Sequence, residues 1–426
     1  MKFMNNIKEK SKDNFYKYSI FIFVCSLITN AAGYFFHFFV GRILGPASYG
    51  VLGALLTILY IINVPFNTIQ TTIANFTSQL IANNNREAIK RLLTSSLKKI
   101  FIYSLIIFII YILFSKFIAN FLKIDEISLI VLSGFLFIVS LLLAVTWGIM
   151  QGLQFFKSLG YSMIIQGFVK LTFGLVLVLI GFAVKGAMFA IILSYLIPFL
   201  LTLITLRLYI GKGEKMYKTR DIFDYSIPVL IAMMSITLMF SLDIFLVKHF
   251  FNNIEAGYYA ALAMLGKVVY FGSISIVYVM FPKVIELNSK KIGTRNILLK
   301  SLLIVFLFCF VSVLFYYFFP GFTVNLLFGK EYLNIVPLLG KFAVFMSLLS
   351  LIYVLIFYNL SLRKKSFIYI LLLFNIIEIV LLYIYHQSIS QVVNVLFYLS
   401  LALFILMFIY TMLSNKNETF NSNTSL

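Results

Sequence analysis

The feature that most constrains this chain is a succession of long apolar runs, each of a length that can cross a membrane. A transmembrane helix needs about 20 predominantly apolar residues. The runs are continuously apolar, without the alternation typical of barrel strands. The sequence therefore predicts an all-α polytopic membrane protein with about 12 transmembrane helices, at roughly 18–40, 50–80, 97–118, 127–150, 160–183, 187–210, 226–250, 258–282, 299–319, 333–361, 367–386 and 390–413.

Composition supports a membrane protein and argues against a nucleic-acid partner. Hydrophobic residues make up 62% of the 426 residues and charged residues only 11%, against roughly a quarter charged in an ordinary soluble domain. The formal net charge is +20, but the basic residues are spread over short loops and form no clustered face that would bind nucleic acid. We therefore expect a lipid bilayer around the chain and no nucleic acid bound to it.

The distribution of basic residues predicts how the chain is oriented. Most of the 34 lysine and arginine residues fall on loops that share a side with the N-terminus. Cytoplasmic loops of membrane proteins carry an excess of these residues. We expect a multi-pass protein of the plasma (inner) membrane with both termini in the cytoplasm.

The two halves of the chain resemble each other. A shift that lays Gly50 over Gly257 also aligns several neighbouring positions at the end of one span and the start of the next. The matched loop is predicted on the outer side in both halves, as a parallel repeat about an axis along the membrane normal requires. The sequence thus predicts two six-helix lobes, residues 1–215 and 216–426, around a central cavity. This architecture is typical of transporters.

Three segments resemble one known family. They are GRILGPASYG at 41–50, NNIEAGYYAALAMLGK at 252–267, which follows Asp243, and LLFGKEYLNIVPLL at 326–339. These segments are similar to the polysaccharide transporter (lipid-linked oligosaccharide flippase) family of the multidrug/oligosaccharidyl-lipid/polysaccharide exporter superfamily. Together with the pattern of spans, the resemblance covers essentially the whole chain.

The resemblance implies a substrate and a mechanism. The implied substrate is a polyprenyl-diphosphate-linked oligosaccharide, flipped from the cytoplasmic to the outer leaflet for surface polysaccharide biosynthesis in the cell envelope. Two lobes that alternate access to the two sides would move it. A polysaccharide polymerase or glycosyltransferases would be the protein partners.

Polar residues recur along three predicted spans at intervals of three or four, which places them on one face of each helix. A sugar diphosphate cannot cross hydrocarbon bare, because each unpaired polar group there costs several kcal/mol. Such faces can line a wet cavity, or they can hydrogen-bond neighbouring helices. The stripes contain Ser26, Asn30, Gly33 and His37 on the first span, Asn63, Asn67, Thr71, Asn75 and Ser78 on the second, and Ser162, Gln166, Lys170 and Gly174 on the fifth.

Ionisable residues inside apolar runs are the other candidates, because intramembrane charges usually have a function. Lys170 and Lys267 are predicted to hold the substrate's phosphates, although Asp243 could instead neutralise Lys267. Glu378 could couple transport to a proton or sodium gradient, or could hydrogen-bond a neighbouring helix in its protonated form. The candidate cavity residues are Asn30, Asn63, Asn67, Thr71, Asn75, Gln166, Lys170 and Lys267.

Two basic residues near the predicted outer surface, Arg42 and Lys341, are candidates for an outer gate or for headgroup anchors. The three histidines lack ligand spacing, so we expect no metal site. The sequence carries no P-loop, no H-E-x-x-H and no nucleophile constellation, and its inner loops are short, so we expect neither an enzyme nor a cofactor.

Two other functional classes stay open beside the flippase. A cation-coupled multidrug exporter on the same fold usually carries an acidic residue in the first span, and 18–40 contains no Asp or Glu. A membrane polysaccharide polymerase would be expected to carry a long outer loop, and the outer loops here are short. The flippase is therefore the leading interpretation.

Overall fold

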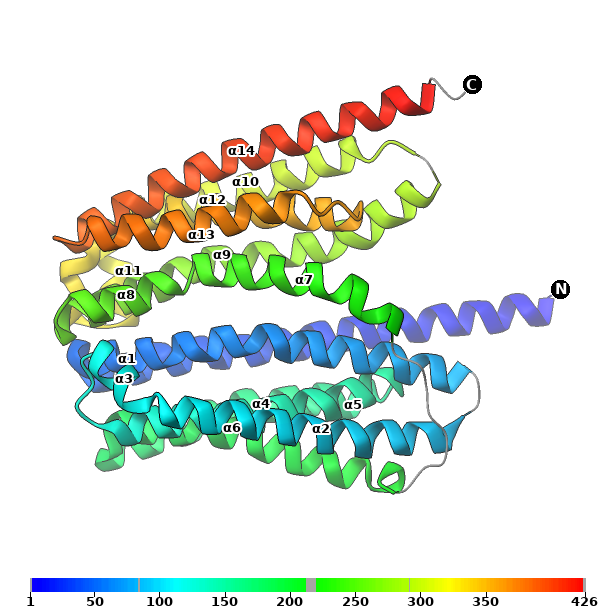
Figure 1. Cartoon of the computed structure of the whole chain (residues 1–426), viewed down its shortest axis with the longest axis horizontal. Helices are drawn as coiled ribbons and strands as arrows, with labels where there is room; N and C mark the ends of the chain where they lie inside the picture. The colour runs from blue at the N-terminus through cyan, green and yellow to red at the C-terminus, as the bar shows by residue number, and fades with distance from the viewer. Residues whose placement is uncertain (1, 83–84, 212–219, 291, 424–426) are drawn as a thin grey trace. The chain divides into compact units, whose positions relative to one another are not determined.

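The protein is helical throughout the residues that the computed structural model describes, which are 2–82, 85–211, 220–290 and 292–423 (Figure 1). This confirms the predicted fold class. The helices are α1 Lys2–Ala82, α2 Arg86–Leu113, α3 Ser115–Phe121, α4 Ile127–Gly152, α5 Phe156–Leu177, α6 Ala183–Thr205, α7 Arg220–Met239, α8 Leu242–Phe250, α9 Asn253–Ser289, α10 Arg295–Phe318, α11 Pro320–Leu327, α12 Val336–Ser361, α13 Phe367–Ile384 and α14 Ile389–Asn423, with short turns η1 Val178–Phe182, η2 Arg207–Tyr209 and η3 Lys330–Ile335.

Nine stretches within the described residues are long and apolar enough to cross a membrane. Two of them, Phe21–Ile81 with 61 residues and Phe156–Thr205 with 50, exceed twice the length of about 20 residues that one crossing needs. Both are interrupted by a glycine with positive φ, Gly45 (φ 70°) in the first and Gly181 (φ 102°) in the second. The eighth predicted run lies within α9. The chain is thus a multi-pass membrane protein, and about 12 crossings stays a prediction.

The chain forms two compact units. The N-terminal unit comprises Met1–Leu44 and Ile62–Phe223, and the C-terminal unit comprises Gly45–Ile61 and Asp224–Leu426. The predicted boundary at 215 and 216 lies in 212–219, outside the described residues. Gly45–Ile61 belongs to the C-terminal unit although the residues on both sides of it belong to the N-terminal unit, and we call it the exchanged segment. It begins where α1 breaks at Gly45.

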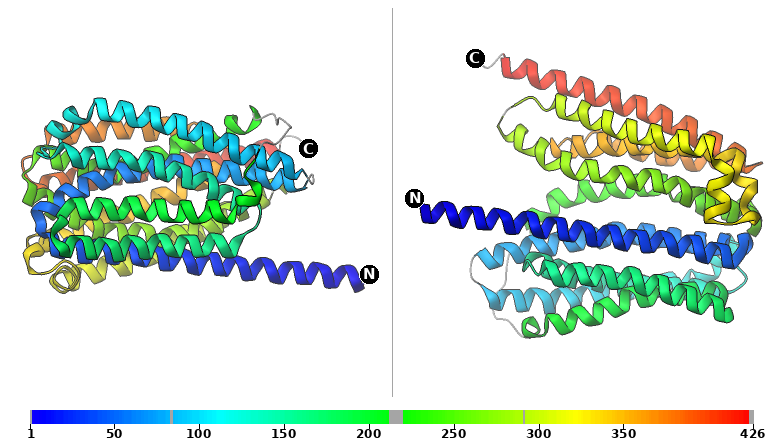
Figure 2. Two further views of the ribbon diagram at one scale, coloured as in Figure 1. Left: turned by 90° about the horizontal axis from the view of Figure 1, so that it is seen from below. Right: turned by 180° about the vertical axis from the view of Figure 1, so that it is seen from behind.

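In the N-terminal unit, α4 packs against α2, α5 and α6, and α5 packs against α6 (Figures 1 and 2). Glycines let α1 approach α5 closely. A Cβ added at Gly160 would lie 2.8 Å from Cys25 Sγ, and one at Gly174 would lie 2.4 Å from the Phe36 ring. Small residues at helix contacts allow the close backbone approach on which packing in membranes depends.

In the C-terminal unit, α12 is the central helix and contacts α9, α10 and α14, while α13 packs against α14 and α8. The exchanged segment joins this unit through glycines. A Cβ at Gly50 would lie 2.6 Å from Asn253 O, and a Cβ at Gly257 would lie 1.7 Å from Pro46 O. The two glycines that the sequence repeat aligns with each other therefore lie at one helix crossing.

Candidate functional site

The polar stripe of the predicted second span is exposed along α1. Asn67, Thr71 and Asn75 are all exposed. The Thr71 hydroxyl donates to the Asn67 carbonyl on its own helix at 2.8 Å, and the Asn75 side-chain oxygen accepts from Gln79 Nε2, also on α1, at 3.1 Å. Both of these hydrogen bonds stay within α1.

Two side chains of the same helix make helix-to-helix contacts: Gln70, which lies off the stripe, and Asn63, at the start of the stripe. Gln70 Nε2 donates to Gln151 Oε1 on α4 at 3.0 Å. Asn63 is half-buried, and its side-chain oxygen accepts from the Tyr195 hydroxyl on α6 at 3.5 Å. Polar residues on α1 thus fall into two groups, one that joins helices and one that is exposed. Exposed amides in an apolar span need water, because hydrocarbon cannot satisfy them.

The other two predicted stripes do not share one environment. On α1, Asn30 is exposed whereas His37 is buried. On α5, Gln166 is half-buried, whereas the Ser162 hydroxyl is buried and accepts a hydrogen bond from Trp147 Nε1 at 2.8 Å. Helical spacing alone could not reveal this difference between residues on one stripe.

Lys170 on α5 lies against an aromatic ring. Its Nζ atom is 4.6 Å from the centroid of the Phe36 ring on α1. The four ion pairs found among the described residues all involve other lysines. A ring attracts a cation weakly compared with a carboxylate and leaves its N–H donors open to an anion.

Lys267 on α9 is fully buried, with 1% of its surface exposed. Its Nζ atom lies 3.8 Å from the centroid of the Tyr60 ring and 5.4 Å from that of Phe240. Tyr60 belongs to the exchanged segment. Within the described part of the chain, none of the ion pairs includes Lys267.

Asp243 on α8 is the acid that the sequence offered as a partner for Lys267. It is fully buried, and its carboxylate accepts from the Tyr259 hydroxyl at 2.6 Å and from the Ile244 N–H at 2.8 Å. Asp243 and Lys267 form no ion pair among the described residues, but their opposite charges still attract each other. The Asp243 carboxylate is therefore near enough to attract Lys267, but its hydrogen bond comes from the Tyr259 hydroxyl.

Glu378 and Asn375 lie one turn apart on α13 and are both buried. In the described structure, both Glu378 carboxylate oxygens and Asn375 Oδ1 have no hydrogen-bond donor. The α13 helix packs against α8, and Asp243 repels Glu378 electrostatically. Buried acceptors without donors carry a large desolvation cost. These oxygens could hold a proton or a small cation, since hard cations take oxygen ligands.

The two basic residues predicted near the outer surface differ in their surroundings. Arg42 on α1 is exposed. Lys341 on α12 is half-buried and donates to Asn394 Oδ1 on α14, with the rings of Phe397 and Tyr398 at 5.4 and 5.6 Å. A group of three or more His, Cys, Asp or Glu residues that could hold a metal ion is not found among the described residues.

Sequence reasoning missed two tyrosines and one lysine. Tyr60 lies over Lys267, and Tyr259 donates to Asp243. Lys248 is fully buried on α8 and donates to Asn253 Oδ1 at 2.7 Å. The segment 252–267 in the family resemblance contains Tyr259 and Asn253 and was the one signal that pointed to this region.

The fold is that of a multi-pass helical membrane protein with exposed polar residues and buried charges inside its spans. The chain belongs to the polysaccharide biosynthesis protein family, whose profile matches residues 39–337. This confirms the resemblance to a polysaccharide transporter family of the multidrug/oligosaccharidyl-lipid/polysaccharide (MOP) superfamily. No curated protein sequence matches the chain.

Solved structures share this fold at low sequence identity. An inward-facing multidrug resistance MATE family transporter of the MOP superfamily has a TM-score of 0.78 and 12% identity, over 95% of this chain and 99% of that one. The lipid II flippase MurJ, inward closed, has a TM-score of 0.71 and 12% identity, over 96% and 91%. A MOP superfamily transporter from Pyrococcus furiosus has a TM-score of 0.61 and 14% identity, over 95% and 96%.

Proposed function

We propose that this protein flips polyprenyl-diphosphate-linked oligosaccharide from the cytoplasmic to the outer leaflet of the plasma membrane, for synthesis of a surface polysaccharide. The observation that carries the proposal is that Lys170 and Lys267 contact aromatic rings and take part in none of the ion pairs of the described residues. Each lysine lies inside an apolar span, with its Nζ atom against an aromatic ring. A transporter of a polysaccharide biosynthesis family with such lysines suits an anionic substrate.

The chemistry of the substrate matches the two kinds of polar group. A diphosphate is bound by ammonium groups through charge-assisted hydrogen bonds, which are about twice as strong as neutral ones. Sugar hydroxyls both donate and accept, so amides such as Asn67 and Asn75 suit them. The exposed stripe on α1 offers these two amides about two turns apart, with the Thr71 hydroxyl between them. Alternating access of the two lobes would then carry the glycan across while its prenyl chain stays in lipid.

Coupling to a proton or sodium gradient is proposed at Asp243, Asn375 and Glu378. A proton on Glu378 satisfies one oxygen, whereas a sodium ion would take unpartnered oxygens such as those of Glu378 and Asn375 as ligands. Glu378→Gln should therefore abolish the dependence of transport on the driving gradient. Proteoliposomes under a sodium gradient at fixed pH, and under a pH gradient without sodium, would identify the ion. If the Glu378→Gln variant responds to both gradients as the wild type does, Glu378 is not part of a coupling site.

A multidrug exporter is the second candidate, since solved MATE transporters share the fold. The absence of an acidic residue from 18–40 argues against it. Cationic groups in the spans also repel the cationic drugs that acidic residues attract.

Deletion of the gene tests the proposal. We expect loss of one surface polysaccharide and accumulation of its lipid-linked precursor in the inner leaflet, provided that the glycosyltransferases which build the precursor are active. Drug sensitivity should not change. The wild-type gene should restore the polysaccharide, and so should Lys185→Gln, a control in which an exposed lysine loses its ion pair with Glu126. Normal surface glycan together with new drug sensitivity would instead establish the exporter.

A further inference from the structure

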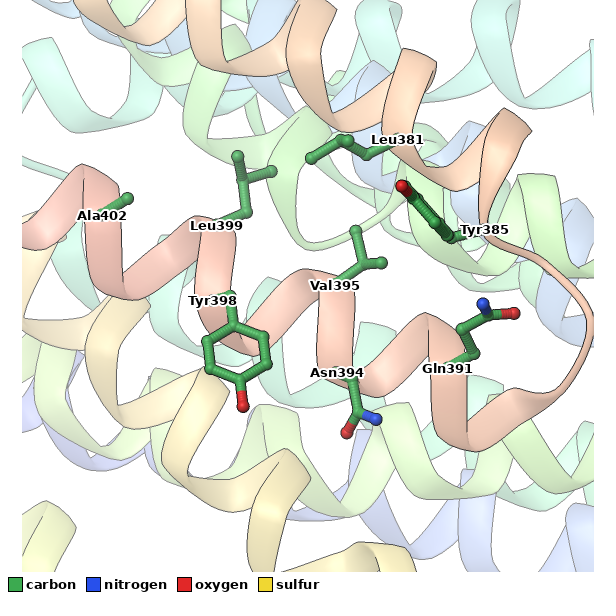
Figure 3. A pocket seen from close by; sticks show the side chains of 8 residues that line it. All are labelled: Leu381, Tyr385, Gln391, Asn394, Val395, Tyr398, Leu399 and Ala402. Carbon is green, nitrogen blue, oxygen red and sulfur yellow. The ribbon is translucent and has the colours of Figure 1, made fainter.

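A groove runs between two helices of the C-terminal unit, and its lining residues include none of those assigned to substrate or coupling ion. Leu381 of α13 and Tyr385, directly after its end, form one side, and α14 contributes a face from Gln391 to Ala402 (Figure 3). Its volume is about 390 Å³, within the usual range of roughly 300 to 1,000 Å³ for small-molecule sites. Its surface is almost wholly apolar. Such a groove suits a hydrocarbon chain.

The length of the groove corresponds to one leaflet. Eleven residues separate Gln391 from Ala402, which is about 16 Å along a helix. One leaflet contributes about 15 Å of hydrocarbon. In the topology predicted from the basic loops, the turn before Ile389 is on the outer side, so the groove runs from the outer interface toward the middle of the bilayer.

A cation on the neighbouring helix α12 contacts two of the residues that line this groove. Lys341 on α12 donates to Asn394, which lines the groove, and lies 5.6 Å from the ring centroid of Tyr398, which also lines it. Asn394 and Tyr398 project from the same side of α14 (Figure 3). Lysines near the ends of spans extend their ammonium groups toward the headgroups. The amide and the rings hold Lys341 beside the groove.

We propose that this groove binds one acyl chain of an anionic glycerophospholipid from the outer leaflet, with its phosphodiester beside Lys341. One lysine complements the single negative charge of a phosphodiester, whereas a polyprenyl diphosphate carries more charge. The proposed site is therefore a lipid site separate from the substrate path. It rests on the predicted topology and not on the proposed flipping.

Lipid retention by the purified full chain tests the site, with phosphatidylglycerol and phosphatidylcholine as probes. Native mass spectrometry should show more phosphatidylglycerol retained than phosphatidylcholine. Lys341→Met keeps an unbranched side chain, one atom shorter, and removes its charge, so the preference for phosphatidylglycerol should fall about fivefold. Ala402→Phe fills the inner end of the groove and should reduce retention of both lipids.

Two control variants match these substitutions. Lys330→Met removes an exposed lysine of the same unit, and Leu406→Phe enlarges an exposed α14 residue beyond the groove. Both should retain lipid as wild type does, and the apparent melting temperature of every variant establishes that it is folded. A wild-type lipid preference in Lys341→Met would overturn the proposal. Displacement of phosphatidylglycerol by polyprenyl diphosphate, or by inorganic phosphate alone, would overturn the assigned occupant.

Discussion

Lys170 and Lys267 are positive charges inside apolar spans, and each lies against an aromatic ring. If they bind the substrate's diphosphate, Lys170→Gln and Lys267→Gln should each reduce glycan export by at least about tenfold, because a hydrogen bond to a charged group contributes roughly 1.5 to 3 kcal/mol. Arginine at either position should retain part of the activity, since the charge is kept while the geometry changes. Surface polysaccharide and protein level in the membrane are the measurements. Normal export by both glutamine variants would exclude the lysines from the substrate path.

The relation between Lys267 and Asp243 can be tested separately. Tyr259 donates to Asp243, while Lys267 lies over Tyr60, so we expect that Asp243→Asn combined with Lys267→Gln does not restore the export lost in Lys267→Gln alone. A purely structural ion pair behaves differently, because removing both charges relieves the penalty of leaving one unpaired. The measurements are the glycan export and the protein level of the two single variants and of the double variant, which together form a double-mutant cycle. Full rescue in the double variant would assign Lys267 a structural role.

For single residues, the sequence predicted which charged side chains matter but not which side chains surround them. Lys170, Lys267 and Glu378 could be recognised because ionisable residues are rare in apolar runs. The tyrosines Tyr60 and Tyr259 could not, because the chain has 26 tyrosines and nothing in their spacing marks these two. The contact of Lys267 with Tyr60 joins distant segments, so it depends on tertiary packing.

At the scale of helices, the crossing of α1 and α9 depends on glycines. A Cβ at Gly257 would lie 1.7 Å from Pro46 O, so Gly257→Ala requires a shift of the backbone. We expect a loss of about 1 to 3 kcal/mol, as for other overpacked sites, and a lower apparent melting temperature in detergent. Gly33→Ala is the matched control, since nothing lies within 4 Å of the added Cβ and alanine is the better helix former. Equal melting temperatures for the two variants would contradict the close crossing.

Helix positions were predictable from the sequence, but their ends were less so. The predicted spans 18–40 and 50–80 imply a loop between them, whereas α1 continues through this region and breaks at Gly45 alone. The pair Gly45 and Pro46 explains the difference. Glycine adopts the positive φ that ends one helix, and proline suits the first turn of the next, so no loop residues are needed.

For the whole molecule, the sequence predicted two lobes but not the exchanged segment. Residues Gly45–Ile61 belong to the C-terminal unit although their neighbours on both sides belong to the N-terminal unit. Periodicity and composition describe a span by itself and carry no information on which helices it contacts. The close approach of Gly50 to the backbone at Asn253 is one of the contacts that join this segment to the C-terminal unit.

The predicted orientation of the whole chain can be tested by cysteine labelling with a reagent that does not cross membranes. Asn288→Cys and Ser366→Cys, both exposed, should react only in inverted vesicles, because their loops carry the basic residues expected of the cytoplasmic side. Asn325→Cys, also exposed, should react in intact cells. The native thiols give little background, since Cys25 and Cys309 are 1% and 3% exposed. Labelling of Asn288→Cys and Asn325→Cys from the same side would reject the topology, and with it the assignment of the α13/α14 groove to the outer leaflet.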